Sequence, residues 1–265
     1  MGRRPGAQTK ECVGTMPTNE VQALFNSKAR FWSAKYGPGG ELNRRLEQFA
    51  TRLCELSPSP GRILDLGCGT GEISAALCEK GYQVTACDIA ERMLEVARAD
   101  RGEMPITWIS LKPGWNDLPF ETGSFDGIVA SSVFEYLTDV QGMVAELSRV
   151  LRPTGVLVFS VPNPYSRIRR LEKWLSSDHL LGNLPPCILR IRRVKSYVTY
   201  LQISRNRFGP RGWQRILAAT GFESVNETDF SNERWLEQAS APLILLAAKK
   251  QTTNKNSSAS TVNKK

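Results

Sequence analysis

The chain has 265 residues, a hydrophobic fraction of 41% and a charged fraction of 23%, which is the profile of an ordinary globular protein of one large domain. No apolar run approaches the roughly 18–20 residues that cross a bilayer, and no apolar stretch follows the basic N-terminus as a secretory signal requires. With six cysteines, no C-x-x-C pair and a single histidine, we expect buried free thiols and no metal site. A cytoplasmic location is the expectation.

The two ends of the chain are polar and lack hydrophobic periodicity, so residues 1–19 and 251–265 are expected to be disordered tails. Between them, residues 20–58 carry two helical patterns. The first runs from Val21 to Trp32 and the second from Leu42 to Leu56, with a turn rich in glycine and proline between them. This stretch is predicted to be an N-terminal helical cap.

From Arg62 onward, short apolar strands alternate with helices. Strands are expected at 62–66, 83–88, 106–111, 125–133 and 155–161, and helices at 72–80, 91–98 and 140–151. Because these strands are apolar throughout and separated by helices, they predict a parallel sheet covered on both faces, an α/β doubly wound fold. In such a fold the ligand binds at the carboxyl ends of the strands.

After Pro162 the alternation stops, and residues 163–208 are predicted to be an inserted lid. A helix at 212–220, a strand at 223–227 and an apolar strand at 242–248 then suit a terminal hairpin. Residues 20–250 are therefore predicted to form a single domain.

The predicted lid carries the charge of the protein. Eleven Lys or Arg and two acids lie between Asn163 and Arg211, a net +9 that equals the net charge of the whole chain. Residues 167–175 predict a basic amphipathic helix with Ile168, Leu171 and Leu175 on one side. Such a surface suits an acidic substrate or an anionic membrane, and RNA phosphates less well because no aromatic platform accompanies it. The structural alternative is a lid whose apolar side packs on the sheet while its arginines face water.

A glycine-rich turn joins the first strand to the next helix in the run ILDLGCGTGEI at residues 63–73. Glycines let the backbone approach a ligand closely, and the helix that follows offers free N–H groups. A dinucleotide-binding G-x-G-x-x-G would place its third glycine at position 72, where Glu72 stands, and no Walker loop is present. The pattern here is D-x-G-x-G-x-G.

This pattern resembles the first motif of the class I S-adenosylmethionine-dependent methyltransferases. The runs CDIAERML (87–94), LPFETGSFD (118–126) and ELSRVLRPTG (146–155) are also similar to that family, in its small-molecule branch of quinone and sterol methyltransferases. The resemblance covers residues 62–162. It implies a Rossmann-like seven-stranded sheet with an antiparallel last strand, S-adenosyl-L-methionine as cofactor, and a cofactor site at Asp65, Gly67, Cys68, Gly69, Gly71, Asp88, Ile89, Met93, Trp115, Asn116 and Ser131.

Within that site, Asp88 ends the second strand, where an acid accepts hydrogen bonds from the ribose hydroxyls. The resemblance places Ile89 and Met93 on the two sides of the adenine. One position departs from the family, because Gly114 stands where an acid usually holds the adenine amino group. Backbone groups, Asn116 or Asp117 are the substitutes, with Trp115 covering the ring.

Methyl transfer from a sulfonium is an in-line displacement, so alignment and exclusion of water supply much of the catalysis. A hydroxyl acceptor also needs a base. The candidates are His179 in the lid, and Glu135 and Tyr136 after the fourth strand, where the run 134–136 either lines the acceptor pocket or starts a helix facing solvent. Phe31, Trp32 and Tyr36 of the cap either close over the cofactor or pack in the core.

The sequence thus predicts S-adenosylmethionine-dependent methyl transfer to an oxygen or nitrogen of a small or lipid-like, acidic molecule. Two alternatives stay open: an RNA methyltransferase that uses the basic lid, and a non-catalytic scaffold that binds the cofactor. A dehydrogenase ranks last, because the third glycine is displaced and no second catalytic domain remains.

Overall fold

The computed structural model describes residues 18–37, 40, 42–112, 114, 117–175, 190–225 and 241–252. The two expected tails lie outside these residues apart from their inner ends. At the first of these ends, helix α1 (Thr18–Lys28) begins two residues inside the segment predicted to be disordered. At the other, residues 251–252 follow the last strand.

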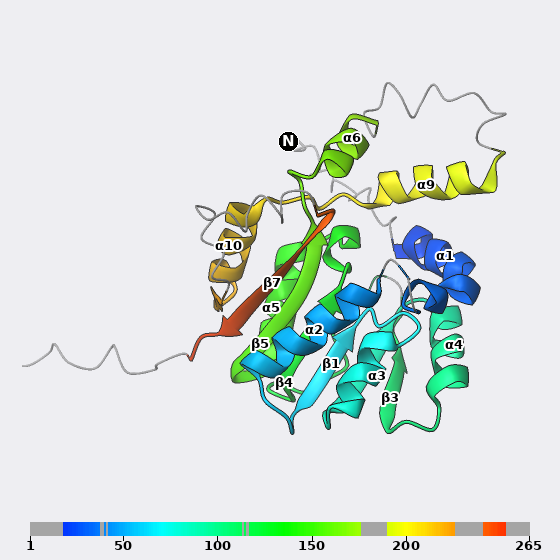
Figure 1. The fold of residues 1–265 in the computed structure, drawn as a ribbon. Helices are drawn as coiled ribbons and strands as arrows, with labels where there is room; N and C mark the ends of the chain where they lie inside the picture. Colours follow the sequence, from blue (N-terminus) through cyan, green and yellow to red (C-terminus); the bar gives the residue numbers. More distant parts are fainter. Residues whose placement is uncertain are drawn as a thin grey trace, which may run out of the picture.

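A seven-stranded sheet forms the centre of the molecule (Figure 1). Its strands are β1 Arg62–Leu66, β2 Gln83–Asp88, β3 Ile106–Ser110, β4 Phe125–Ser131, β5 Leu151–Pro162, β6 Phe222–Ser224 and β7 Leu243–Lys250. They lie in the order β3-β2-β1-β4-β5-β7-β6. Strands β1 to β5 pair in parallel, whereas β7 is antiparallel to both of its neighbours. The predicted doubly wound fold with an antiparallel last strand is therefore confirmed.

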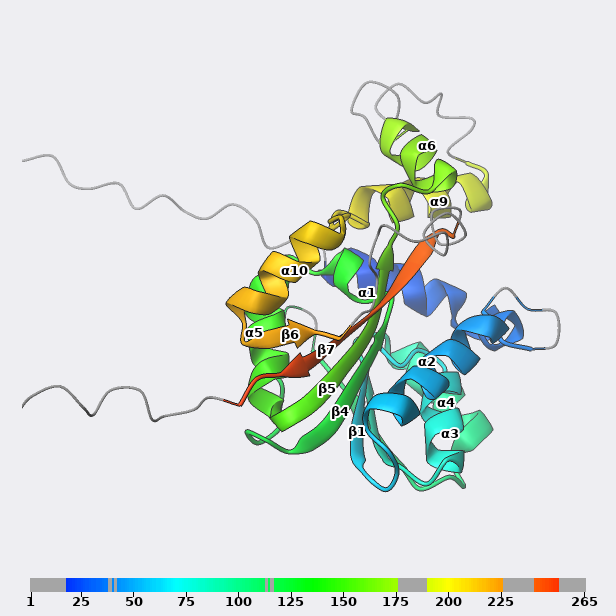
Figure 2. The ribbon, with the colours of Figure 1, turned by 60° about the vertical axis from the view of Figure 1, so that its left-hand side comes forward.

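Helices cover both faces of this sheet (Figure 2). Helices α2 (Asn43–Leu56), α3 (Glu72–Glu79) and α4 (Glu91–Arg101) contribute to the core on one face, and α5 (Val140–Val150) and α10 (Pro210–Ala219) to the core on the other. The central strands β1, β4 and β5 therefore need apolar residues on both sides, which is why they read as largely apolar runs rather than alternating ones.

The two cores hold the sheet rigid beneath the site. On one face Phe49 and Leu53 of α2 are fully buried with Ile63 of β1. On the other, the rings of Phe134, Phe159 and Trp213 pack with centroids 4.9–5.4 Å apart. Burying a large apolar side chain stabilises a fold by roughly 1.5–3 kcal/mol, so these clusters fix the strand ends that carry the loops above them.

Several element ends differ from the predicted ones. Strand β5 begins at Leu151 instead of 155, because Leu151 pairs with Phe125 before the register shifts. Strand β6 stops at Ser224, short of the predicted 227, and α10 begins at Pro210, whose fixed φ suits a first helical position. Helix α4 continues to Arg101, beyond the predicted 98.

Above the carboxyl edge of the sheet lie two lid helices, α6 (Arg167–Leu175) and α9 (Arg192–Ile203) (Figures 1 and 2). Helix α6 has the bounds predicted for the basic amphipathic helix. Val21 and Leu24 of α1 are buried with Ile203 of α9, so the cap and the lid meet. In the described part of the chain, no helix is both long and apolar enough to cross a bilayer.

Candidate functional site

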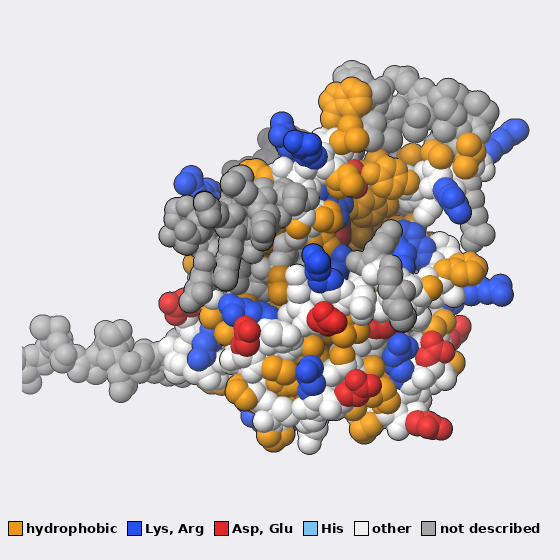
Figure 3. Space-filling view, in the orientation of Figure 1, with side chains coloured by type: hydrophobic (Ala, Val, Ile, Leu, Met, Phe, Trp, Pro, Cys, Tyr) orange, Lys and Arg blue, Asp and Glu red, His pale blue; other side chains and the backbone are white. Residues whose placement is uncertain are grey.

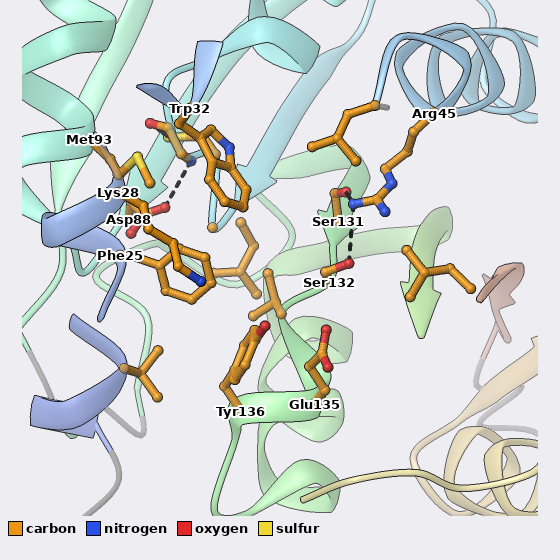
Figure 4. Close-up of a pocket in the computed structure, with 18 of the residues that line it drawn as sticks. Phe25, Lys28, Trp32, Arg45, Asp88, Met93, Ser131, Ser132, Glu135 and Tyr136 are labelled. Carbon is orange, nitrogen blue, oxygen red and sulfur yellow. Dashed lines mark hydrogen bonds between the residues drawn. The ribbon is translucent and has the colours of Figure 1, made fainter. Parts of the chain in front are cut away.

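A cavity of about 400 Å³ opens at the carboxyl edge of the sheet, where β1 stands between β2 and β4 (Figure 4). This is the point at which the strand order reverses, and loops on either side of it diverge to leave a crevice. The walls come from the turn after β1, the ends of β2 and β4, the cap, and the lid helices α6 and α9. Segments far apart in the sequence thus share one cavity.

The glycine-rich turn after β1 forms the floor of this cavity. Gly67 and Gly69 have φ angles of +69° and +57°, a region that L side chains rarely adopt. A Cβ on Gly67 would lie 2.4 Å from Cγ2 of Val133, and one on Gly69 would lie 3.3 Å from Nε1 of Trp32. The turn is tied to β2, since the Gly67 N–H donates to the Cys87 carbonyl at 2.8 Å.

The third glycine of the motif has a different place. Gly71 caps α3 with φ +86° and does not line the cavity. A Cβ there would lie 2.4 Å from Cη2 of Trp108 on β3. Gly71 therefore lets the turn pack against the sheet from behind, while Gly67 and Gly69 face the ligand space together with Cys68.

A buried ion pair clamps the same turn. The Arg101 Nη1 donates to the Thr70 carbonyl at 2.9 Å and its Nη2 pairs with Glu72 at 3.3 Å. The Thr70 hydroxyl lies 2.7 Å from Glu72 Oε2. Because Arg101 projects from α4, a third segment holds the turn in shape, a constraint that no sequence motif signalled.

Asp88 stands at one end of the cavity, beside Ile89 and Met93. Its Oδ2 accepts the Gly69 N–H and its Oδ1 accepts the Ala90 N–H, both at 2.8 Å. A carboxylate offers about four lone-pair positions, so two remain for a ligand. Burial raises the pKa of Asp88 above its usual value, and the backbone N–H groups oppose that rise.

At the opposite end, Arg45 of α2 reaches the end of β4 (Figure 4). Its Nη1 lies 3.3 Å from the Ser132 hydroxyl and 3.5 Å from that of Ser131. No carboxylate among the described residues forms an ion pair with it. Tyr36 also lines this end, and burial raises its pKa to about 12. Sequence analysis missed Arg45, because a basic residue on the polar side of a helix carries no distinguishing signal.

Asp65, the acid of the glycine motif, lies between these ends and is only 1% exposed. Its Oδ2 accepts the Ser74 hydroxyl at 2.6 Å. Burial raises the pKa of Asp65 to about 7, although the Ser74 hydrogen bond acts in the opposite direction. The Asp65 carboxyl therefore lines the cavity as a hydrogen-bond acceptor, and its pKa of about 7 means that it titrates near neutral pH.

The sequence predicts that Asn116 or Asp117 holds the adenine amino group in place of the acid missing at Gly114, and that Trp115 covers the ring. Trp115 and Asn116 lie outside the described residues. Asp117 is exposed and is not among the residues that line the cavity. Leu111, at the end of β3, does line it, and so extends the apolar wall formed by Ile89 and Met93.

The turn after β4 closes the cavity from below in Figure 4 and is the short helix η3, Phe134–Tyr136. Glu135 is 2% exposed, so the alternative of a solvent-facing helix start is wrong. It and Tyr136 line the cavity, whereas Phe134 is buried in the core. The Glu135 Oε2 accepts the Ser204 hydroxyl at 2.6 Å and lies 3.4 Å from the Tyr200 hydroxyl.

Burial sets the protonation of these two side chains. It raises the pKa of Glu135, against the hydrogen bond from Ser204 and the positive charges of Arg169, Arg207 and Arg45. It raises the pKa of Tyr136 well above its usual value, with the neighbouring Glu135 adding to the effect. Both shifts favour the protonated form, so Tyr136 is a hydrogen-bond donor at neutral pH and Glu135 binds a proton more readily than an exposed glutamate does.

The lid closes this half of the cavity with a second buried ion pair. The Arg169 Nη1 donates to Glu172 Oε2 at 2.8 Å and also contacts the Tyr200 hydroxyl. The Tyr197 hydroxyl donates to Glu172 Oε1 at 3.1 Å. These lid residues, missed by sequence analysis, join α6 to α9 directly above η3.

The cap contributes the remaining wall. Trp32 and Tyr36 line the cavity as one of the predicted alternatives requires, but Phe31 is 68% exposed and does not. Lys28 points in from α1, with its Nζ 5.7 Å from the centre of the Phe25 ring. Burial lowers the pKa of Lys28, and nearby Lys35 lowers it further.

Two of the remaining expectations concern catalysis and metals. His179, proposed as a base, lies outside the described residues. In the described ranges, no group of three or more His, Cys, Asp or Glu side chains is placed to hold a metal ion. Of the candidate bases, Glu135 and Tyr136 are the two that the structure brings to the cavity.

Known proteins resemble this chain in sequence. Residues 64–159 match a family model described as a methyltransferase domain. The ubiquinone biosynthesis O-methyltransferase of Xanthomonas oryzae pv. oryzae (strain PXO99A) is 30% identical over 59% of this chain and 66% of its own length. The malonyl-[acyl-carrier protein] O-methyltransferase of Legionella pneumophila is 32% identical over 55% and 51%. The chain spans from a quarter to two thirds of the length of the first curated relatives that it matches.

Solved structures share its fold. Magnesium protoporphyrin IX methyltransferase from Synechocystis PCC 6803 with bound SAH superposes with a TM-score of 0.62, over 88% of this chain and 99% of that one, at 18% sequence identity. The sequence matches and the fold agree with the glycine motif and with the S-adenosylmethionine cofactor that it predicted. Residues 64–159 therefore form a methyltransferase domain, of the class I S-adenosylmethionine-dependent type that the glycine motif indicates.

Proposed function

We propose that the chain transfers the methyl group of S-adenosylmethionine to an oxygen atom of a small, lipid-like acceptor. The observation that carries this proposal is a single cavity with two chemically different halves. One half follows the glycine turn from Asp88 at one end to Arg45 at the other, and the second half holds Glu135 under the lid. The Xanthomonas and Legionella relatives are both named as O-methyltransferases, which favours oxygen over nitrogen.

The first half fits the cofactor residue by residue. Asp88 has acceptor positions for the ribose hydroxyls, and Ile89 and Met93 offer apolar surface to the adenine. Gly69 leaves the floor open where a Cβ would meet Trp32. Arg45, which lacks an acidic partner among the described residues, is suited to the carboxylate of the methionine part.

The second half fits the acceptor. The cofactor supplies an electrophilic methyl group on a sulfonium. Glu135 takes the proton of the acceptor hydroxyl as the oxygen–carbon bond forms and the carbon–sulfur bond breaks, its electron pair staying on sulfur. Tyr136 donates a hydrogen bond that orients the acceptor. The cap and the lid exclude water, so that Glu135 meets the acceptor in a dry site.

Three further parts belong to the proposal. Residues 20–250 form one methyltransferase domain, with a cap at 20–58 and a lid at 163–208. The acceptor is acidic, which the basic residues of the lid support. The protein works in the cytoplasm, which the free thiols of Cys54, Cys68, Cys78 and Cys87 support, because disulfides are rare in that reducing compartment.

Calorimetric titration with S-adenosylmethionine and, separately, with NAD tests the first half. Binding of S-adenosylmethionine alone is expected, and binding of NAD alone would overturn the assignment. Release of S-adenosylhomocysteine with phenolic, quinol and carboxylic amphiphiles tests the second. If the cofactor binds but no acceptor is methylated, the scaffold alternative replaces the enzyme.

With an acceptor in hand, Glu135→Gln tests the base. The amide keeps the shape but accepts no proton, so kcat should fall by about 10²- to 10⁴-fold while cofactor affinity stays unchanged. Glu121→Gln, an exposed glutamate that does not line the cavity, is the matched control. A wild-type kcat in folded Glu135→Gln would remove Glu135 from the mechanism.

A further inference from the structure

Exposed apolar side chains are concentrated on the lid. Of the eight large hydrophobic residues exposed in the described part of the chain, seven lie between residues 165 and 208, and the eighth is Phe31. Three of them belong to α6: Ile168, Leu171 and Trp174 are 58%, 54% and 62% exposed. Exposed apolar surface gathered in one place marks an interaction site more often than scattered residues do.

The opposite side of α6 explains why these residues face outward. Arg169 and Glu172 pair there, with only 10% and 7% of their side chains exposed, and they close the cavity. Because the inward side of the helix is occupied by this ion pair, the apolar residues cannot turn onto the sheet. The alternative in which the apolar side of the lid packs on the sheet is therefore wrong for Ile168 and Leu171 of α6.

Basic residues border the apolar ones. Arg167, Arg170 and Lys173 are all exposed and alternate along α6 with Ile168, Leu171 and Trp174. These six residues are called the lid surface. In Figure 3, orange apolar side chains gather over α6 and toward α9, with blue Lys and Arg side chains around them. On α9, Arg193, Lys195 and the 45% exposed Tyr197 continue the same mixture.

This composition matches the interface of an anionic bilayer. A helix with one apolar and one basic side lies in the plane of the headgroups, where its apolar residues reach the acyl chains and its cations meet lipid phosphates. Tryptophan and tyrosine favour that depth. A water-soluble acidic partner would use the cations but would leave Leu171 and Trp174 exposed, so charge and hydrophobicity together favour lipid.

The lid surface also adjoins the cavity. Ile168 lines the acceptor half of the cavity and belongs to the lid surface as well. We propose that the lid surface docks on an anionic lipid bilayer and that an amphiphilic acceptor enters the cavity from that bilayer beside Ile168. This inference rests on the proposed function, because it names where the acceptor of that same site is collected.

Vesicle co-sedimentation tests the docking with the full chain. Vesicles of phosphatidylcholine with phosphatidylglycerol should bind the protein, those of phosphatidylcholine alone should bind it far less, and added salt should weaken the binding because it screens the cations. Leu171→Asn with Trp174→Asn should reduce the partition coefficient about tenfold or more. Phe31→Asn, at an equally exposed apolar residue of the cap, is the control and should have no effect.

Variants that remove positive charge provide a second test of the docking. Changing Arg167, Arg170 and Lys173 to Gln should cost about fivefold in binding per residue, whereas the same change at the exposed Lys80, Arg92 and Lys249 should cost little. The docking proposal would be overturned if the protein failed to bind phosphatidylglycerol vesicles, or if test and control variants lost equal amounts of binding. It would also be overturned if the test variants lost self-association while their lipid binding stayed unchanged. Titration with S-adenosylmethionine, expected to be unchanged in every variant, separates that outcome from failure of the proposed function.

Discussion

Replacing Asp88 with alanine tests the cofactor half of the site. The change removes two hydrogen bonds of 2.8 Å, from the N–H groups of Gly69 and Ala90. Because both donors border the cavity, water replaces part of what is lost, and we expect the free energy of unfolding to fall by about 2 kcal/mol. For a chain of this size that corresponds to a Tm lower by roughly 4–8 °C.

The effect on binding is larger. Hydrogen bonds to a charged group contribute about 1.5–3 kcal/mol each, and two to the ribose should therefore weaken S-adenosylmethionine binding by about 10²- to 10⁴-fold. Calorimetry on the folded variant measures this. Asp139→Ala is the control, because Asp139 also accepts a backbone N–H at 2.8 Å, from Gly142, but lies away from the cavity. It should lose about 1 kcal/mol of stability and no affinity. Wild-type affinity in folded Asp88→Ala would refute the placement of the ribose.

Three other variants probe the cavity and the turn that supports it. Gly71→Ala combines a φ of +86° with a Cβ 2.4 Å from Trp108, so urea unfolding should show a loss of about 2–5 kcal/mol. Arg45→Met should weaken S-adenosylmethionine about ten- to a hundredfold while leaving adenosine binding unchanged, and equal losses for both ligands would exclude a role at the carboxylate. In the cofactor-free protein, stability should fall between about pH 4 and about pH 7, because unfolded Asp65 loses its proton near 3.8 and folded Asp65 keeps it to about 7. Asp65→Asn should flatten that slope in chemical denaturation, and an unchanged slope would assign it to other groups.

The cofactor half of the site could be predicted because it is local in sequence. The run from Asp65 to Met93 contains the glycine turn, Asp88 and the apolar wall, since β1 and β2 are neighbours both in the chain and in the sheet. The backbone conformation of this turn can be recognised in the sequence, because positions with a positive φ favour glycine. Gly71 shows the limit of that reasoning: the motif includes it, but its reason is packing against Trp108 rather than contact with the cavity.

The acceptor half could be predicted only in part, because its residues meet through long-range contacts. Glu135 was a candidate from its place after β4, but nothing in the sequence shows that Ser204 and Tyr200 bind it. Arg45 looks like any basic residue on an amphipathic helix. The bounds of α6 followed from its periodicity, whereas its orientation did not, because a buried pair of opposite charges at Arg169 and Glu172 reads in sequence as a polar, exposed side.

The attachment of the lid to η3 has a consequence for engineering the acceptor range of this protein. The Glu135 carbonyl accepts the N–H groups of Arg205 and Asn206, and the Asn206 side chain donates to the carbonyls of Phe134 and Leu137. These hydrogen bonds join the lid and the turn that carries Glu135 into one structural unit. A chimera that received only a foreign lid would lose these hydrogen bonds, and Glu135 would be displaced. To change the acceptor specificity by exchanging lids, residues 133–137 therefore have to be transferred together with the lid.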